Sequence, residues 1–339
     1  MKKNAKYIKL IISVLSILIA LSCNKIREDN FFIKGKTNGI VDGTFIFLQD
    51  ISTDKILDST LIENNYFEFD TSLSNFPVGT LVFTKDYPEY RFVWLENNPM
   101  TFDASRSNFK NAKVEGSDTE NLSQKLYKVA STLPRNERQK MEKDFVKQNP
   151  NSILSAYILS VYSATWGKKN VSELFKDFSK RNKESVYGKS ISDYLRLNKN
   201  PRIGDTFVDF EMQNVYGFSE KLSDFNNKVI LLEFWASNCG PCRLENPNLV
   251  KTYKKFNPLG FEIFAVSQDT NKENWLKAIE KDSLPWHHVS DLKRKDIASL
   301  IYGVTGIPDN FLINTDGEIV GRNLRGNELN DKLSSIFSK

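Results

Sequence analysis

The strongest constraint on the fold is a run of strand length that leads directly into a pair of cysteines. Residues 228–235 (KVILLEFW) are apolar apart from the first lysine and Glu233, which is typical of a strand buried on both faces. The sequence ASNCGPCR follows at once and opens a helical pattern. Pro241 suits the first turn of a helix, where its missing N–H group costs nothing. The sequence therefore predicts a strand-to-helix junction with Cys239 and Cys242 at the start of the helix.

The segments after this junction predict a complete α/β domain. The order of strand and helix patterns is β-α-β-α-β-β-α, in about 135 residues, which is a usual size for one domain. A polar stretch with Pro and Gly precedes it and is interpreted as a linker, so the domain with its linker is expected at residues 198–339. The later elements are expected at residues 261–266 (strand), 271–281 (helix), and 310–314 and 319–322 (a hairpin around Thr-Asp-Gly).

The N-terminal half shows no pattern of catalytic residues. Residues 31–115 alternate apolar and polar positions between turn signals, which predicts a small β-rich domain. This stretch has no His or Cys, and its aromatic residues lie at strand spacing, where core packing is the commoner explanation. Residues 116–197 change to a helical period and predict a connecting helical segment. Asn149 and Pro150 are expected as the cap and first-turn proline of its central helix.

The first residues predict export from the cytoplasm. Four lysines lie within residues 1–9, and the apolar run that follows has signal-peptide length but is too short for a comfortable membrane span. The sequence Ala-Leu-Ser-Cys ending at Cys23 resembles a bacterial lipobox, in which the cysteine is lipidated after cleavage. We expect a signal peptide at residues 1–22, a lipid on Cys23, a tether at residues 23–30 and a membrane-anchored protein facing the periplasm. An uncleaved signal anchor or an ordinary secretory signal is the alternative.

The leader also carries the excess of positive charge. The chain has 47 basic and 42 acidic residues, and removing the four leader lysines leaves 43 basic residues against 42 acidic ones. A nearly neutral exported chain without a basic tail has no electrostatic reason to bind nucleic acid. We therefore expect no nucleic-acid partner.

The two cysteines that follow the buried strand have three possible uses. For redox chemistry, a helix N-terminus lowers the pKa of a thiol, which makes Cys239 the exposed nucleophile and Cys242, one turn in, the resolving thiol. A zinc site needs four ligands and would have to recruit the adjacent His287 and His288, the only two histidines. A purely structural disulfide across so short a loop would remove little entropy from the unfolded chain. We expect no metal and no cofactor.

The residues around the cysteines resemble the TlpA/ResA-like thiol-disulfide oxidoreductases of the thioredoxin superfamily. The sequence FWASNCGPCR is similar to the signature of that family and departs from it at Asn238, where tryptophan is usual. The N-terminal part resembles an uncharacterised β-rich module that often precedes such domains in lipoproteins of Gram-negative bacteria. The other positions that match the family pattern are Gly204-Asp205, Asp209-Phe210, Glu233, Pro247 and Gly306-Ile307-Pro308.

This resemblance implies a thioredoxin fold with a redox-active disulfide between Cys239 and Cys242. It implies that Glu233 exchanges a proton with Cys242 and that Pro308 is cis and presents the backbone of its neighbour to an extended client. The plain alternatives are a solvent-facing acid on an edge strand and an ordinary strand-edge proline. The change at Asn238 implies altered partner choice or redox potential. The residues implied to contact the client are Trp235, which core packing explains equally well, Asn238, Gly240, Pro241 and Ile307.

The function expected is therefore two-electron exchange with protein thiols in the cell envelope, by an α/β thioredoxin-like C-terminal domain. The family is mostly reducing, for example in cytochrome c maturation, so the partners expected are protein thiol or disulfide clients and an upstream thiol-disulfide donor. A peroxiredoxin-like peroxidase is one alternative, but it needs Thr three places before the cysteine, where Ala236 stands. The other alternative is a binding or adaptor lipoprotein in which the β-rich module does the work.

Overall fold

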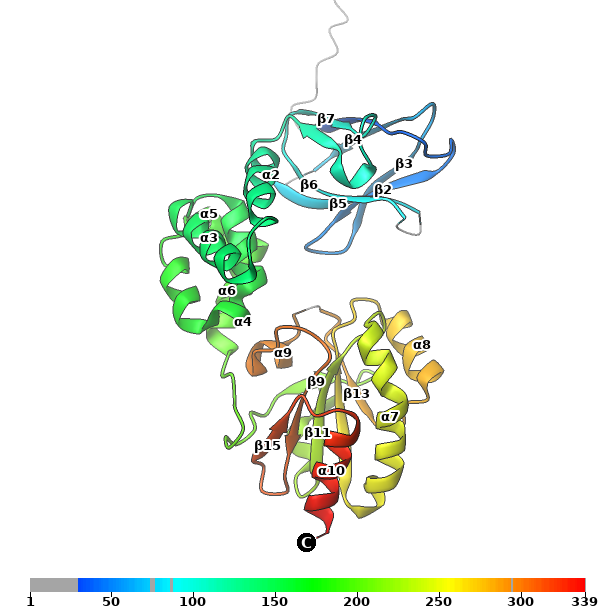
Figure 1. Cartoon of the computed structure of the whole chain (residues 1–339), viewed down its shortest axis with the longest axis vertical. Helices are drawn as coiled ribbons and strands as arrows, with labels where there is room; N and C mark the ends of the chain where they lie inside the picture. The colour runs from blue at the N-terminus through cyan, green and yellow to red at the C-terminus, as the bar shows by residue number, and fades with distance from the viewer. Residues whose placement is uncertain (1–29, 74–76, 86–87, 294, 339) are drawn as a thin grey trace, which may run out of the picture. The chain divides into compact units, whose positions relative to one another are not determined.

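A computed structural model describes residues 30–73, 77–85, 88–293 and 295–338. The chain divides into two compact units, Met1–Leu133 and Pro134–Lys339, and Figure 1 labels many of their elements. The expected signal peptide, the tether and Cys23 lie outside the described residues. In the described part of the chain, no helix is both long and apolar enough to cross a membrane.

The described residues of the first unit form two four-stranded sheets, a short 3-10 helix and the α-helix α2. The sheet orders are β4-β1-β7-β8 and β3-β2-β5-β6. In β7, alternation of apolar and polar residues gives the strand one buried face, because Met100 and Phe102 are buried between exposed neighbours. The elements are β1 (Asn30–Lys36), β2 (Phe45–Asp50), β3 (Ile56–Leu61), β4 (Tyr66–Ser72), β5 (Val78–Thr84), β6 (Tyr90–Leu95), β7 (Pro99–Asp103), β8 (Lys113–Glu115) and α2 (Asp118–Ala130).

A buried acid joins the helix of this unit to its sheet. The carboxylate of Glu120 in α2 accepts hydrogen bonds from the Arg91 side chain at 3.0 Å and from the backbone N–H group of Trp94 at 2.9 Å. Both partners belong to β6, so this buried charge is paired and hydrogen-bonded, as a stable fold requires. The role of Glu120 is therefore structural.

The second unit begins with four helices. They are α3 (Arg135–Gln148), α4 (Ile153–Phe175), α5 (Lys180–Glu184) and α6 (Val186–Leu197). The predicted cap at Asn149 is wrong: this residue is the C-cap of α3, and α4 begins after Ser152. The turn between the two helices takes up Asn149 and Pro150, because the backbone N–H group of Asn149 still bonds to the carbonyl of Phe145 at the end of α3.

The rest of the second unit is the predicted α/β domain. Its five-stranded sheet has the order β13-β12-β11-β14-β15. The strands β11, β12 and β13 run parallel to one another, and β14 pairs antiparallel with both of its neighbours, β11 and β15. Its elements are β9 (Glu211–Gln213), β10 (Ser219–Lys221), β11 (Val229–Trp235), α7 (Gly240–Phe256), β12 (Phe261–Ser267), α8 (Lys272–Asp282), β13 (His287–Val289), α9 (Ile297–Tyr302), β14 (Asp309–Ile313), β15 (Ile319–Arg322) and α10 (Gly326–Phe337).

The central strand β11 is buried along its whole length and separates two hydrophobic clusters. Leu231 and Trp235 belong to the cluster that includes residues of α7, α8 and α10. Leu232 and Phe234 alternate with them and belong to the cluster that includes α9. Because successive side chains of a strand point to opposite faces, Glu233 shares the α7 face with Leu231 and Trp235. This places a carboxyl group on the side of the sheet that carries the cysteines.

The polar linker is fixed to this domain by hydrogen bonds. The backbone N–H groups of Lys199 and Asn200 both donate to the carbonyl of Ile301, at 3.0 and 2.9 Å. The side chain of Asn198 donates to the carbonyl of Leu300 at 2.9 Å. These bonds satisfy carbonyls in the last turn of α9, so the end of α6 and the end of α9 are held together.

Candidate active site

The junction between β11 and α7 holds the two cysteines, as the sequence predicts. Cys239 is the N-cap of α7, and its Sγ accepts a hydrogen bond from the backbone N–H group of Cys242 at 3.2 Å. The two residues form a disulfide, and their Cα atoms are 5.3 Å apart. At this position the sulfur of Cys239 faces the unpaired N–H groups and the positive end of a 17-residue helix. Such a site stabilises a thiolate.

The surroundings of the disulfide are apolar and mostly closed. Cys239 has 9% of its surface exposed and Cys242 has 2%. Cys239 is therefore the more exposed of the two, as expected, but it is far more buried than expected. The reason is that both cysteines belong to the hydrophobic cluster on the α7 face. Four residues next to the cysteines in sequence are exposed: Asn238, Gly240, Pro241 and Leu244, of which Leu244 was not singled out in the sequence analysis.

The loop that carries the cysteines is held by side chains that the sequence analysis missed. The carboxylate of Asp269 accepts hydrogen bonds from the backbone N–H group of Ser237 at 2.9 Å and from its hydroxyl. The same carboxylate accepts from the hydroxyl of Ser267 at 2.7 Å. Asp269 follows the end of β12, so it ties the neighbouring strand to the loop before Cys239. It is 7% exposed, and these donors satisfy its buried charge.

Arg243 supports the same loop from within α7. Its guanidinium donates to the carbonyl of Ser237 at 2.9 Å and to both carboxylate oxygens of Asp282 at the end of α8, one of them at 2.6 Å. This two-pronged ion pair lowers the pKa of Asp282 and fixes the guanidinium plane. Its charge is therefore matched by Asp282, and the arginine acts mainly on the position of the loop.

Glu233 is the buried acid of the site. It lies in the central strand with 4% of its surface exposed, and its Oε2 atom has no hydrogen-bond partner among the described residues. Burial raises its pKa from 4.5 to about 8, while the side chains of Asn310 and Arg325 oppose this rise. A solvent-facing acid on an edge strand is therefore wrong for this residue. A carboxyl group that titrates near neutral pH can take up and release protons under working conditions.

The Ile307–Pro308 peptide bond, which precedes β14, is cis. Ile307 is partly buried and packs against the hydrophobic cluster that contains both cysteines and also against the cluster on the other face of the sheet. The guanidinium of Arg325 donates to the carbonyl of Pro308 at 2.5 Å. This hydrogen bond ties the segment to the start of α10.

Trp235 and His288 form an aromatic layer on the same face of the sheet. Trp235 is 2% exposed and lies in the cluster of the cysteines, and its ring centroid is 5.6 Å from that of His288. Trp286 covers the other part of the imidazole, at 5.8 Å. His288 is 5% exposed, and desolvation lowers its pKa to about 3. It is therefore neutral at physiological pH.

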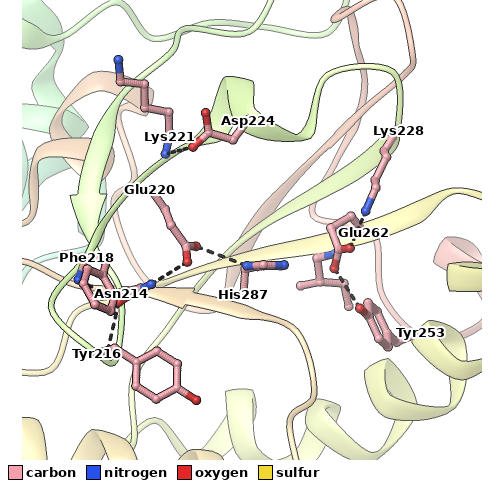
Figure 2. A network of polar contacts seen from close by, with 11 residues as sticks. Asn214, Tyr216, Phe218, Glu220, Lys221, Asp224, Lys228, Tyr253, Glu262 and His287 are labelled. Atoms are coloured by element: carbon pink, nitrogen blue, oxygen red, sulfur yellow. Dashed lines mark hydrogen bonds and ion pairs between the residues drawn. The ribbon is translucent and has the colours of Figure 1, made fainter.

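His287 points to the opposite face and belongs to a separate polar network, which Figure 2 shows. Its Nδ1 atom is 3.2 Å from the carboxylate of Glu220, and Glu220 accepts from Asn214 at 2.6 Å. Asn214 in turn accepts from the backbone N–H groups of Tyr216 and Phe218 at the turn of the β9–β10 hairpin. This network ties the hairpin to β13. The described residues contain no group of three or more His, Cys, Asp or Glu side chains placed to hold a metal ion.

Comparison with known proteins agrees with this geometry. A family model described as AhpC/TSA matches residues 203–322. Over these residues the C-terminal domain is similar to the AhpC/TSA family. Another model, a domain of unknown function called DUF4369, matches residues 31–122, the β-rich part of the chain. The predicted fold is therefore confirmed: a thioredoxin-like domain follows a β-rich module and a helical segment.

The curated relatives of this domain include the thiol-disulfide oxidoreductase ResA of Geobacillus thermodenitrificans, which is 33% identical over 117 residues. That match covers 34% of this chain and 66% of the relative, just under two thirds of its length. ResA of Bacillus thuringiensis is 27% identical over 146 residues, which are 43% of this chain and 83% of the relative. The solved thioredoxin domain of a thiol-disulfide oxidoreductase from Bacteroides vulgatus is 34% identical, with a TM-score of 0.38, over 40% of this chain and 99% of that one. The ResA relatives confirm the predicted resemblance.

Proposed function

We propose that this protein is a thiol-disulfide oxidoreductase that exchanges two electrons with protein clients through Cys239 and Cys242. One observation carries the proposal: the sulfur of Cys239 caps a long helix and accepts the N–H group of Cys242, while the sulfur of Cys242 is within bonding reach. The first feature stabilises the attacking thiolate, and the second allows the exchange to finish. The ResA relatives support the same class of reaction.

The reaction runs in two displacements when the protein acts as the reductant. The Cys239 thiolate attacks one sulfur of a client disulfide; the client S–S bond breaks, and one client thiolate leaves and takes a proton. The Cys242 thiol then gives its proton to the Glu233 carboxylate and attacks the sulfur of Cys239. The mixed disulfide breaks, the second client thiolate leaves, and the protein keeps the new disulfide. The client gains two electrons, and an upstream dithiol donor restores the two cysteines.

The environment of Glu233 supports its role as the proton acceptor. Its pKa of about 8 lies near that of a free thiol, so proton transfer from Cys242 has little driving force in either direction. It also shares the α7 face of the sheet with the cysteines. A carboxylate with the usual pKa would be a weak base toward a thiol. The same raised pKa allows the reverse transfer when the disulfide is reduced.

We also propose that the exposed rim around the disulfide binds the client. The cis Ile307–Pro308 segment offers backbone to an extended client, beside Asn238 and Pro241. The protein would be held in the cell envelope by a lipid on Cys23 and face the periplasm, where it reduces clients such as apocytochrome c. The β-rich module would position the domain or select the client.

A trapping experiment tests the proposal. In the Cys242→Ser variant the mixed disulfide has no resolving thiol, so covalent client complexes accumulate in cells, and a reducing agent cleaves them. The Cys239→Ser variant should form no such complexes. The oxidation state of the trapped clients gives the direction of transfer. The proposal fails if insulin reduction is as fast in Cys239→Ser as in the parent protein. It also fails if the protein consumes peroxide without any protein disulfide.

A further inference from the structure

A small cavity lies between α3 and α4, outside the thioredoxin-like domain. Its volume is about 410 Å³, within the range of sites that bind small molecules. Every side chain that lines it can form hydrogen bonds. The lining residues are Arg135, Arg138, Gln139, Glu142, Tyr162 and Thr165.

The spacing of these residues shows that the cavity replaces part of a helix–helix core. The four on α3 follow the pattern i, i+3, i+4, i+7, which is the stripe that a helix normally buries with apolar side chains. One turn further along the same stripe stands Val146, which is fully buried. Tyr162 and Thr165 face the stripe from α4, again one turn apart. The first two turns of α3 therefore present polar groups at positions where packing alone favours Leu or Ala.

Glu142 gives this cavity an unused hydrogen-bond acceptor. The residue is 1% exposed, and its Oε2 atom has no partner among the described residues. Leaving a buried acceptor unpaired costs free energy, so a ligand that donates to it gains affinity. The phenol of Tyr162 interacts with the same carboxyl group, and its ring stacks on Trp166 at 5.4 Å, which fixes it at the wall of the cavity.

The two arginines give the cavity a positive charge. Among the described residues, neither Arg135 nor Arg138 lies within ion-pair distance of a carboxylate, so both guanidinium groups have unused donors. Arg138 is half-buried, and Arg135 is the exposed first residue of α3. The N-cap of this helix is Pro134, which provides no side-chain acceptor for the first-turn N–H groups. The lining residues therefore carry two positive charges and at most one negative charge, and this positive balance favours an anionic ligand.

We propose that this cavity binds a small organic carboxylate that carries a hydrogen-bond donor beside the carboxylate group. The carboxylate would bind between the guanidinium groups of Arg135 and Arg138, and the donor would bond to Oε2 of Glu142. Neither requirement involves the cysteines. The site is therefore a binding site separate from the disulfide and independent of the proposed redox function.

The test uses the full-length protein and three probes that differ by one group. N-acetylglycine has both a carboxylate and an amide N–H donor, N-acetylsarcosine lacks the donor, and N-acetylglycinamide lacks the charge. Binding is followed by ligand-observed NMR up to about 50 mM, because so small a ligand is expected to bind in the millimolar range. We expect N-acetylglycine to bind at least about tenfold more tightly than either of the others, since N-acetylsarcosine loses the hydrogen bond to Glu142 and N-acetylglycinamide loses the charge that pairs with both guanidinium groups.

Substitutions of the lining residues test which side chain binds each end of the ligand. Arg138→Gln should abolish binding, whereas Lys140→Gln, an equal loss of charge at an exposed position of the same helix, should leave it unchanged. Glu142→Met should remove the preference for N-acetylglycine over N-acetylsarcosine, and its thermal unfolding shows whether it folds. The proposal is overturned if no probe saturates, if the uncharged probe binds as well as N-acetylglycine, or if Arg138→Gln binds like the parent protein.

Discussion

Glu233→Gln should change how the stability of the thioredoxin-like domain depends on pH. The pKa of this acid is about 8 in the folded protein against 4.5 as its ordinary value, so the folded state holds the proton more tightly. The stabilising effect of the protonated form is complete below about pH 4.5 and is lost as pH rises toward about 8. Each pH unit in this window costs about 1.4 kcal/mol, so at pH 7 the parent protein has lost about 3 kcal/mol relative to pH 4.5. Glutamine cannot ionise, and the variant avoids this loss.

Urea denaturation of the disulfide form, followed by tryptophan fluorescence, measures the effect. Four of the five tryptophans lie in Pro134–Lys339, so the signal reports mainly on this unit. The free energy of unfolding of Glu233→Gln minus that of the parent protein should increase by about 3 kcal/mol between about pH 4.5 and pH 7. Glu318→Gln, at an exposed position, should show no such trend. A flat difference for Glu233→Gln across this range would refute the raised pKa, and with it the assignment of Glu233 as the proton acceptor.

Three further substitutions test other parts of the site. Asp269→Asn should destabilise the cysteine loop by about 1–3 kcal/mol in the same urea assay, because a buried acceptor is lost, whereas exposed Asp316→Asn should not. His288→Phe should fold at pH 7, and its free energy of unfolding relative to that of the parent protein should rise by about 3 kcal/mol between pH 7 and pH 4. If the difference in free energy of unfolding between variant and parent is the same at both pH values, burial of a neutral imidazole is contradicted. Leu244→Glu should raise the KM for a protein disulfide and leave kcat and stability unchanged, and the same KM change in Leu259→Glu would show a nonspecific charge effect.

The strand-to-helix junction could be predicted from sequence because its signals are local. A strand that is apolar except for Glu233, a proline that fits a first helical turn and the cysteine spacing all lie within one short segment. Asn149 and Pro150 show where a local signal misleads, because the same pair suits a helix start and the turn that closes the preceding helix. Whether the pair starts α4 or closes α3 depends on where α3 ends, and the polar sequence of α3 contains no clear signal for its C-terminus.

The rest of the site depends on pairing between distant segments. The burial of His288 is not visible in its own segment, because it depends on distant residues: the end of β13 is bridged to the segment after β9, where the backbone N–H group of Ser290 donates to the carbonyl of Gln213. Asp269 and Asp282 look like surface acids in the sequence, since their partners in the cysteine loop lie 32 and 39 residues away. The cavity at Glu142 was missed because a polar stripe on a helix normally indicates a solvated face.

Two buried acids in neighbouring strands show which kind of burial points to function. Glu262 in β12 is 3% exposed, but it accepts from Lys228 at 3.0 Å and from the hydroxyl of Tyr253 at 3.0 Å, as Figure 2 shows. Glu233 in β11 is equally buried and keeps an oxygen without a partner. A paired buried carboxylate is explained by the fold alone, whereas an unpaired one costs stability and implies a use for its proton.

The buried acid and the buried imidazole on this face oppose each other as pH changes. In the sheet register Glu233 pairs with Ala265, and Ala265 pairs with His288, so the two side chains lie in one row across the α7 face. Glu233 loses its stabilising effect as pH rises from about 4.5 to 8, and His288 loses its own as pH falls from 6.5 to about 3. Between about pH 4.5 and 6.5 the two slopes cancel, and stability falls on both sides. Taken together, these two groups stabilise the fold most while Glu233 is protonated, and their combined contribution falls in the pH range where that proton becomes available to the cysteines.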